Sequence, residues 1–152
     1  MSTYRGQMYN SDTQNTELHT VEEAAIAYGS PTSRIELSRQ GLLPEFVQDL
    51  MSLFTFSKTE LSKLTAISTK TLERHMQSGK RFTGLQSDRL LELAQLYHEG
   101  VNTFGKREKF LQWLKSPIAA LNQTTPKSWL DTHDGIQMIS HELGRIRHGI
   151  FS

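Results

Sequence analysis

A short segment in the middle of the chain carries hydroxyl side chains and cations at a spacing suited to binding nucleic acid. If residues 68–77 are helical, these residues lie on or beside one face: Thr69, Lys70, Thr71, Arg74 and His75. Side chains of this kind hydrogen-bond to phosphates and base edges when a helix lies in the major groove of DNA. We therefore expect these five residues to contact DNA. For His75, burial in the helix crossing is an equal alternative, because this position is usually apolar in such motifs.

Two short helices that meet at a sharp turn must position these side chains. Ser57 followed by Glu60 forms a capping box, which predicts the start of the first helix, and Ser68 can cap the second. Two positions depart from the usual pattern, since Ser62 replaces an alanine and Ala66 replaces a glycine. Alanine in a left-handed turn would be strained by about 1 kcal/mol. The pattern favours a helix-turn-helix, with an ordinary helical hairpin as the alternative.

Positive charge is concentrated around this motif. The 152-residue chain has a formal net charge of only +1. Residues 56–82 contain six cations and two carboxylates, so this segment has a net charge of +4 and the rest of the chain a net charge of −3. The cations are Lys58, Lys63, Lys70, Arg74, Lys80 and Arg81. A basic face on a nearly neutral protein is typical where one surface meets a polyanion, although it can also be a solvated charged face.

Three cations outside the second helix join the candidate DNA contacts, namely Lys58, Lys80 and Arg81. Lys80 and Arg81 lie in a loop between two glycines. This loop could wrap against a phosphate backbone, or it could be a mobile connector.

Composition and the absence of certain motifs argue against several other classes of function. The chain has no cysteine, and 36% of its residues are hydrophobic, enough for a core. Neither a membrane-spanning run nor a signal peptide is recognisable, so we expect a cytoplasmic protein. The six histidines lack metal-ligand spacing, and no nucleophile motif or phosphate-binding glycine loop is present. We therefore expect no enzymatic activity, metal or cofactor.

Helical periodicity extends over the rest of the chain and predicts an all-α fold. After a flexible, polar tail at residues 1–20, we expect a helix-turn-helix domain at 21–105 and a smaller helical domain at 106–152. Predicted helices begin at Val21, Pro31, Pro44, Ser57, Ser68, Ser87-Asp88, Lys106, Ser116-Pro117, Thr125-Pro126 and Asp131 or Thr132. The helix that begins at Ser87-Asp88 and ends before Gly105 is long enough to join the two domains.

The second half resembles the toxin-binding domain of Xre/MbcA/ParS-type antitoxins. The resemblance is carried by Phe110, Trp113, Leu114, Pro117, Leu121, Pro126, Trp129, Leu130, Thr132, Gly135, Leu143, Ile146 and Gly149. Upstream, Gly41, the helix-turn-helix at 57–76 and Ser87-Asp88-Arg89-Leu90 also look like that family. Asn122-Gln123 stands where the family usually has one or two glycines, and asparagine tolerates the left-handed backbone such a turn needs.

This resemblance implies a bacterial type II antitoxin. The N-terminal half would bind operator DNA and repress the antitoxin's own operon, while the C-terminal half would hold a protein toxin inactive. The usual partner is a RES-domain toxin that acts on NAD, and the antitoxin's C-terminal end would block its cleft. Independently, the helix-turn-helix predicts a homodimer, because two recognition helices must reach half-sites about 34 Å apart.

The last residues are the candidate toxin contacts: Arg145, Arg147, His148, Gly149, Ile150, Phe151 and Ser152. We expect the three cationic side chains to pair with acidic or phosphate-binding groups of a cleft while Ile150 and Phe151 plug its mouth. Alternatively, the arginines simply suit the helix dipole and Phe151 folds back on its own core. The rival function is a helix-turn-helix transcriptional regulator with a dimerising or ligand-sensing C-terminal domain and no toxin.

Overall fold

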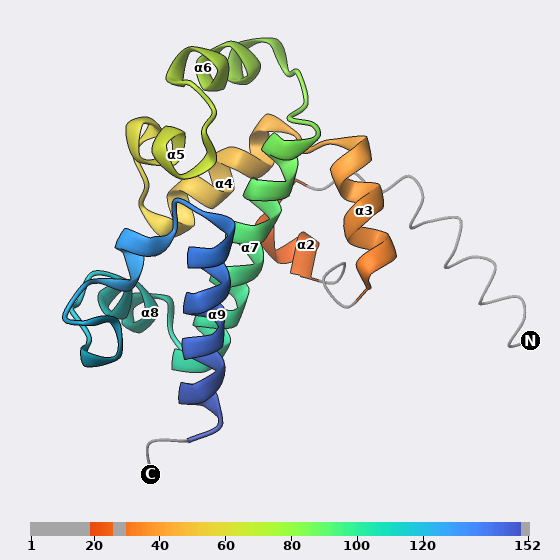
Figure 1. Cartoon of the computed structure of the whole chain (residues 1–152). Coiled ribbons are helices and arrows are strands. Elements are labelled where there is room, and N and C mark those ends of the chain that lie inside the picture. Colours follow the sequence, from red (N-terminus) through yellow and green to blue (C-terminus); the bar gives the residue numbers. More distant parts are fainter. Residues whose placement is uncertain (1–18, 26–29, 150–152) are drawn as a thin grey trace, which may run out of the picture.

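The computed structural model describes residues 19–25 and 30–149, and in that part of the chain the fold is built from helices (Figure 1). The elements are α2 (Val21–Ala25), α3 (Pro31–Gln40), α4 (Pro44–Phe54), α5 (Lys58–Thr65), α6 (Thr69–Ser78), α7 (Leu85–Phe104), α8 (Arg107–Leu114), η2 (Ala119–Leu121), η3 (Pro126–Trp129) and α9 (His133–Arg147). Extended pairing in these residues is limited to two isolated bridges, Leu42 with Phe82 and Ile118 with Thr124. The all-α prediction is confirmed. No helix in the described ranges is long and apolar enough to cross a membrane.

The long helix α7 is the spine of the molecule. Helix α9 packs along it on one side, and α2, α3, α4 and α8 also contact it (Figure 1). Its Leu90, Leu93 and Leu96 are buried in one continuous apolar cluster that extends from Phe46 of α4 to Ile139 of α9. Both halves therefore share α7, and the predicted boundary at residue 105 stays a prediction.

Capping residues determine where the two helices of the helix-turn-helix begin and end. The capping box is present in full, because the Ser57 hydroxyl accepts from the Glu60 amide at 3.1 Å and Glu60 accepts from the Ser57 amide at 3.3 Å. Ala66 ends α5 in a left-handed conformation with φ 57°, and the Ser68 side chain caps α6. The turn thus tolerates alanine where the motif prefers glycine.

Two predicted helix starts are wrong. Helix α7 begins at Leu85 rather than at Ser87-Asp88, because Gly84 is its N-cap and the buried Ser87 hydroxyl donates back to the Gly84 carbonyl at 2.7 Å. Ser116 starts no helix, since its hydroxyl donates to the Gln112 carbonyl at 2.7 Å and so completes the end of α8. The short helix η2 begins only at Ala119.

An aromatic cluster and a polar contact join α8 to the N-terminal half. The Phe110 ring lies 6.1 Å from the rings of both Phe54 and Tyr97, measured between centroids. The Arg107 guanidinium donates to the Leu53 carbonyl at 2.9 Å near the end of α4, and also to the Ser52 carbonyl at 3.1 Å, which accepts from the Thr55 amide as well. The two halves are therefore held together by specific contacts as well as by the shared spine.

Candidate DNA and toxin interfaces

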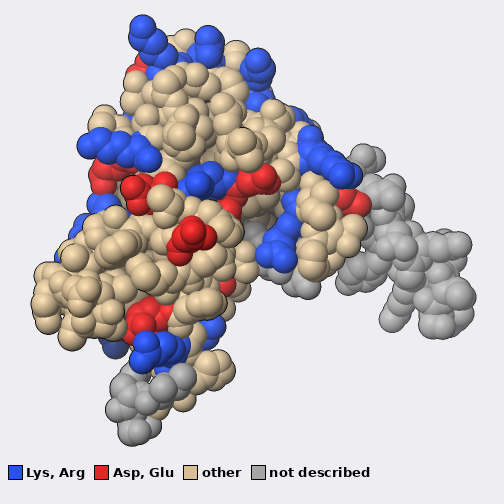
Figure 2. All heavy atoms as spheres, in the orientation of Figure 1, with Lys and Arg blue, Asp and Glu red and all other residues tan. Residues whose placement is uncertain are grey.

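Helix α6 presents its cations to solvent at one end of the molecule. Lys and Arg side chains gather over α5 and α6 along the top of the view in Figure 2. Leu72 and His75 form the buried face of α6, whereas Lys70 and Arg74 are exposed on the opposite side. A cationic outer face on the second helix of a helix-turn-helix is the arrangement needed for docking in a major groove.

The first turn of α6 organises the hydroxyl groups and Arg74. The Ser68 hydroxyl accepts from the Thr71 amide at 3.1 Å and donates to the Thr71 hydroxyl at 2.9 Å. The Arg74 guanidinium in turn donates to the same Thr71 hydroxyl at 3.2 Å, which directs it toward the N-terminal end of α6. Thr69 is half-buried beside them. Base-contacting residues of such helices lie at this N-terminal end.

Lys58 lies beside α6 at the start of α5. Its ammonium is 3.8 Å from the Glu73 carboxylate, and both side chains are about half exposed, at 51% and 53%. An exposed ion pair of this kind contributes little to stability. Lys58 therefore remains a candidate phosphate contact whose charge is partly compensated.

The basic loop after α6 is anchored rather than loose. Phe82 is fully buried, and its backbone exchanges two hydrogen bonds with Leu42, at 2.8 and 2.9 Å. Gly41 lets the two segments approach, because a Cβ added there would lie 2.9 Å from the Phe82 carbonyl oxygen and its φ is +91°. Lys80 is exposed and Arg81 half-buried in this loop. The loop is therefore attached to the fold at Phe82, one residue after Arg81, and its backbone carries both cations beside the end of α6.

The structure places His75 in the helix crossing, the alternative to DNA contact that the sequence had left open. Its side chain is buried, with only 6% of its surface exposed, and its ring lies 4.4 Å from the Phe82 ring. Its Nδ1 has no hydrogen-bond partner among the described residues. Burial lowers the pKa of His75, and the nearby charges of Lys80 and Arg74 lower that pKa further. His75 is a neutral core residue that supports the basic loop, as its usually apolar position in the motif had allowed.

The buried imidazole predicts a loss of stability on mild acidification. Because the folded-state pKa of His75 lies below the ordinary value of about 6.5, the unfolded chain binds its proton first as the pH falls. Above about pH 6.5, His75 is neutral in both states and does not change the free energy of unfolding. Below that pH, protonation of the unfolded chain lowers the free energy of unfolding. We expect the melting temperature to fall more between about pH 7.5 and pH 5.5 in the wild type than in His75→Phe. Equal pH dependence of the two proteins would contradict this assignment.

Cations also gather at the end of α9, at the opposite pole of the molecule from α6 (Figures 1 and 2). Arg145 lies 3.4 Å from the Glu142 carboxylate, and Arg147 donates to the Thr103 hydroxyl at 3.2 Å. Both arginines and His148 are exposed, and Gly149 has a φ of +65° just after the helix. The remaining candidates Ile150, Phe151 and Ser152 lie outside the described residues.

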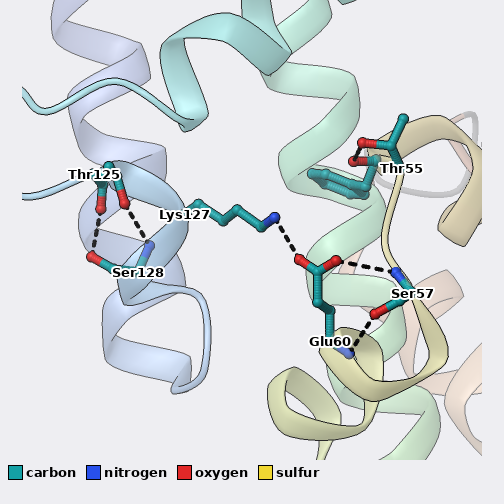
Figure 3. Close-up of polar contacts among 7 residues, drawn as sticks. Thr55, Ser57, Glu60, Thr125, Lys127 and Ser128 are labelled. Atoms are coloured by element: carbon teal, nitrogen blue, oxygen red, sulfur yellow. Dashed lines mark hydrogen bonds and ion pairs between the residues drawn. The ribbon is translucent and has the colours of Figure 1, made fainter.

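Sequence patterns missed a polar link between the two halves, drawn in Figure 3. The Lys127 ammonium of η3 lies 2.5 Å from the Glu60 carboxylate of α5, and it sits 5.6 Å from the centroid of the Phe56 ring. The hydrogen bond from Lys127 is the largest influence on Glu60 and lowers the pKa of its carboxyl. Thr125-Pro126 located η3 in the sequence, but no local signal pairs Lys127 with a distant carboxylate.

Comparisons with known proteins agree with this two-part architecture. Residues 33–95 match the Antitoxin Xre-like helix-turn-helix domain, and residues 100–149 match the Antitoxin Xre/MbcA/ParS C-terminal toxin-binding domain. The chain is 32% identical over 114 residues to Antitoxin Xre of Photorhabdus laumondii, covering 74% of this chain and 77% of that protein. It is 27% identical over 129 residues to Antitoxin Xre of Yersinia enterocolitica, covering 82% and 87%. It is 23% identical over 137 residues to the Prs ADP-ribosylating antitoxin of a Sphingobium species, covering 84% and 86%. This chain, with a basic helix-turn-helix at one pole and a toxin-binding domain toward the other, therefore belongs to the Xre antitoxin family.

Proposed function

We propose that this antitoxin neutralises a RES-type, NAD-degrading toxin by blocking the toxin's active-site cleft with its C-terminal region. One observation carries the proposal: the residues matched to a toxin-binding domain end in a turn that exposes Arg145, Arg147 and His148. Exposed arginines suit a cleft whose lining includes carboxylates, because a guanidinium fork pairs with a carboxylate through two parallel hydrogen bonds. The name of the Sphingobium relative mentions ADP-ribosylation, a reaction that draws on NAD, which supports this class of toxin.

The same protein, in our proposal, represses its own operon as a homodimer in the cytoplasm. Lys70 and Arg74 on α6 and Lys80 and Arg81 in the basic loop form the DNA-facing surface. One short helix gives little affinity alone, so a dimer would place two copies of α6 on half-sites about 34 Å apart. Because α6 and the end of α9 lie at opposite poles, one chain can hold DNA and toxin together (Figure 1). The match of residues 100–149 to a toxin-binding domain favours this proposal over a regulator that lacks a toxin.

Deleting residues 148–152 tests the cleft-blocking part. We expect cells that express the toxin encoded beside this chain to grow with the full-length antitoxin and to stop growing with the truncated one. The deletion removes His148 and Gly149 at the end of α9 but leaves the buried Leu143 and Ile139 in place, so the domain should still fold. Full protection by the truncated protein would show that the C-terminal end does not block the cleft.

A further inference from the structure

We propose that the toxin-binding half carries a second docking surface, formed by residues 116–129 and centred on the indole of Trp129, which seats in an uncharged, apolar pocket of the toxin. We call this surface the Trp129 platform. The inference rests on the proposed function, since its partner is the toxin. Residues 116–129 lie within the segment that matches a toxin-binding domain, which is why we commit to the toxin rather than to a second copy of the chain.

The platform has the composition of the centre of a protein interface. Trp129 is 40% exposed and is the one exposed large hydrophobic side chain of the described C-terminal half, the others being Ile35 and Leu85. Residues 116–126 contain no charged side chain, in a protein that is 22% charged. Its other exposed members are the apolar residues Pro117, Ala119 and Ala120 and the uncharged polar residues Asn122, Gln123, Thr124 and Ser128. Tryptophan is enriched and charge depleted where interfaces are fully buried.

The platform is rigid before any partner binds. Ile118 and Thr124 form a bridge, and Asn122 and Gln123 turn the chain with φ values of 54° and 64°. The Trp129 indole N–H donates to the Thr124 hydroxyl at 2.8 Å, and that hydroxyl donates to a backbone carbonyl at 2.6 Å. The polar edge of the indole is thus satisfied within the chain, while much of the ring stays exposed. A pre-ordered anchor loses less conformational entropy on binding.

The single cation of the segment is turned away from the platform's partner. Lys127 reaches across to Glu60 at 2.5 Å, as Figure 3 shows, while Thr125 caps η3 by accepting from the Ser128 amide at 3.3 Å. This ion pair both removes a charge that would oppose an apolar pocket and fastens η3 to α5. The ion pair therefore holds the platform in place against α5. In the ribbon view, residues 116–129 lie apart from helix α6 (Figure 1).

Binding measurements on full-length variants test the platform against the toxin encoded beside this chain. We expect Trp129→Ala to weaken toxin binding at least about 30-fold, the effect of a central hot-spot residue. Ala120→Glu should weaken it about 10-fold or more, since it places a charge on the apolar surface. Because Ala120 is exposed in η2, that variant should melt like the wild type, so it keeps the test valid if Trp129→Ala fails to fold.

Matched controls lie in the other half of the chain. Ile35→Ala removes an exposed hydrophobic side chain of α3, and Thr32→Glu adds a charge to an exposed position of the same helix. Both should change toxin affinity less than about 2-fold, as surface substitutions usually do. If the wild type binds the toxin and both platform variants bind it as tightly as the wild type does, the proposed role of the platform is wrong while the proposed function stands. If the wild type itself does not bind, the proposed function fails first.

Fluorine NMR of fluorotryptophan-labelled antitoxin gives a second readout. The chain has two tryptophans, and Trp113 lies half-buried with its ring 5.5 Å from that of Phe104. The resonance of Trp129, assigned by its loss in Trp129→Phe, should shift when toxin is added while that of Trp113 stays in place. An unshifted Trp129 resonance in the saturated complex would overturn the platform. A shift that appears with rising antitoxin concentration alone would assign the surface to a second copy and equally overturn it.

Discussion

Gly135→Ala should lower the free energy of unfolding by about 3 kcal/mol or more and abolish toxin binding. A Cβ at position 135 would lie only 1.8 Å from the Trp129 carbonyl oxygen and 2.9 Å from the Thr132 hydroxyl. A backbone oxygen cannot rotate away as a side chain can. The first turn of α9 would have to separate from η3, which would also break the cap that Thr132 provides by accepting from the Gly135 amide at 2.9 Å.

Gly144→Ala is the matched control for this prediction. It adds the same methyl group to the same helix, but the nearest atom there is the flexible end of Arg147 at 3.7 Å. Alanine is favoured over glycine inside a helix, so this variant should be stabilised by about 0.5–1 kcal/mol. Chemical denaturation followed by circular dichroism measures both changes. Similar stability of Gly135→Ala and the wild type would mean that α9 and η3 are not packed as described.

Arg74→Ala should remove discrimination between operator and random DNA. We expect operator affinity to fall about 10- to 100-fold per bound copy, the effect of losing a bidentate contact to a base, with little change on random DNA. Arg74 is placed for this role because it is exposed and its guanidinium is held near the N-terminal end of α6 by Thr71 at 3.2 Å. Titration of fluorescent operator and scrambled duplexes at one salt concentration measures the ratio.

Two lysine variants separate base contacts from phosphate contacts. Lys70→Ala should weaken binding to both DNAs alike and reduce the slope of log affinity against log salt by about 1. Lys109→Ala removes another exposed cation, from α8 in the toxin-binding half, and should change neither the affinity for the two DNAs nor the salt slope. If Arg74→Ala weakens both DNAs equally, Arg74 contacts phosphate and not a base.

Local signals predicted most of the fold because caps and turns depend on neighbouring residues. The capping box at Ser57 and the cap at Thr132 follow from residue type and spacing, and asparagine at position 122 tolerates the left-handed turn found there. Alanine gives no such signal, so only the helix-turn-helix pattern pointed to the left-handed backbone at Ala66. Ser116 shows the limit of such signals, since a serine before proline can cap a new helix or, as here, donate back to the helix it follows. Only packing decides between the two.

The sequence predicted which site residues are exposed where that exposure follows from helical periodicity. Lys70 and Arg74 are exposed as the spacing of α6 predicts, although their contact with DNA stays a prediction. His75 was undecided from sequence, because its burial depends on Phe82 from the following loop. The pairing of Lys127 with Glu60 depends on how the two halves meet across α7, and no short-range pattern encodes that.

In our proposal, this antitoxin holds an NAD-degrading toxin inactive. This proposal is tested by the NAD content of cells that express the cognate toxin, with and without the full-length antitoxin. We predict that NAD falls with the toxin alone and stays near its normal level when the antitoxin is present. NAD that falls equally in cells where the antitoxin is abundant and folded would contradict the account, as would a toxin that stops growth while leaving NAD unchanged.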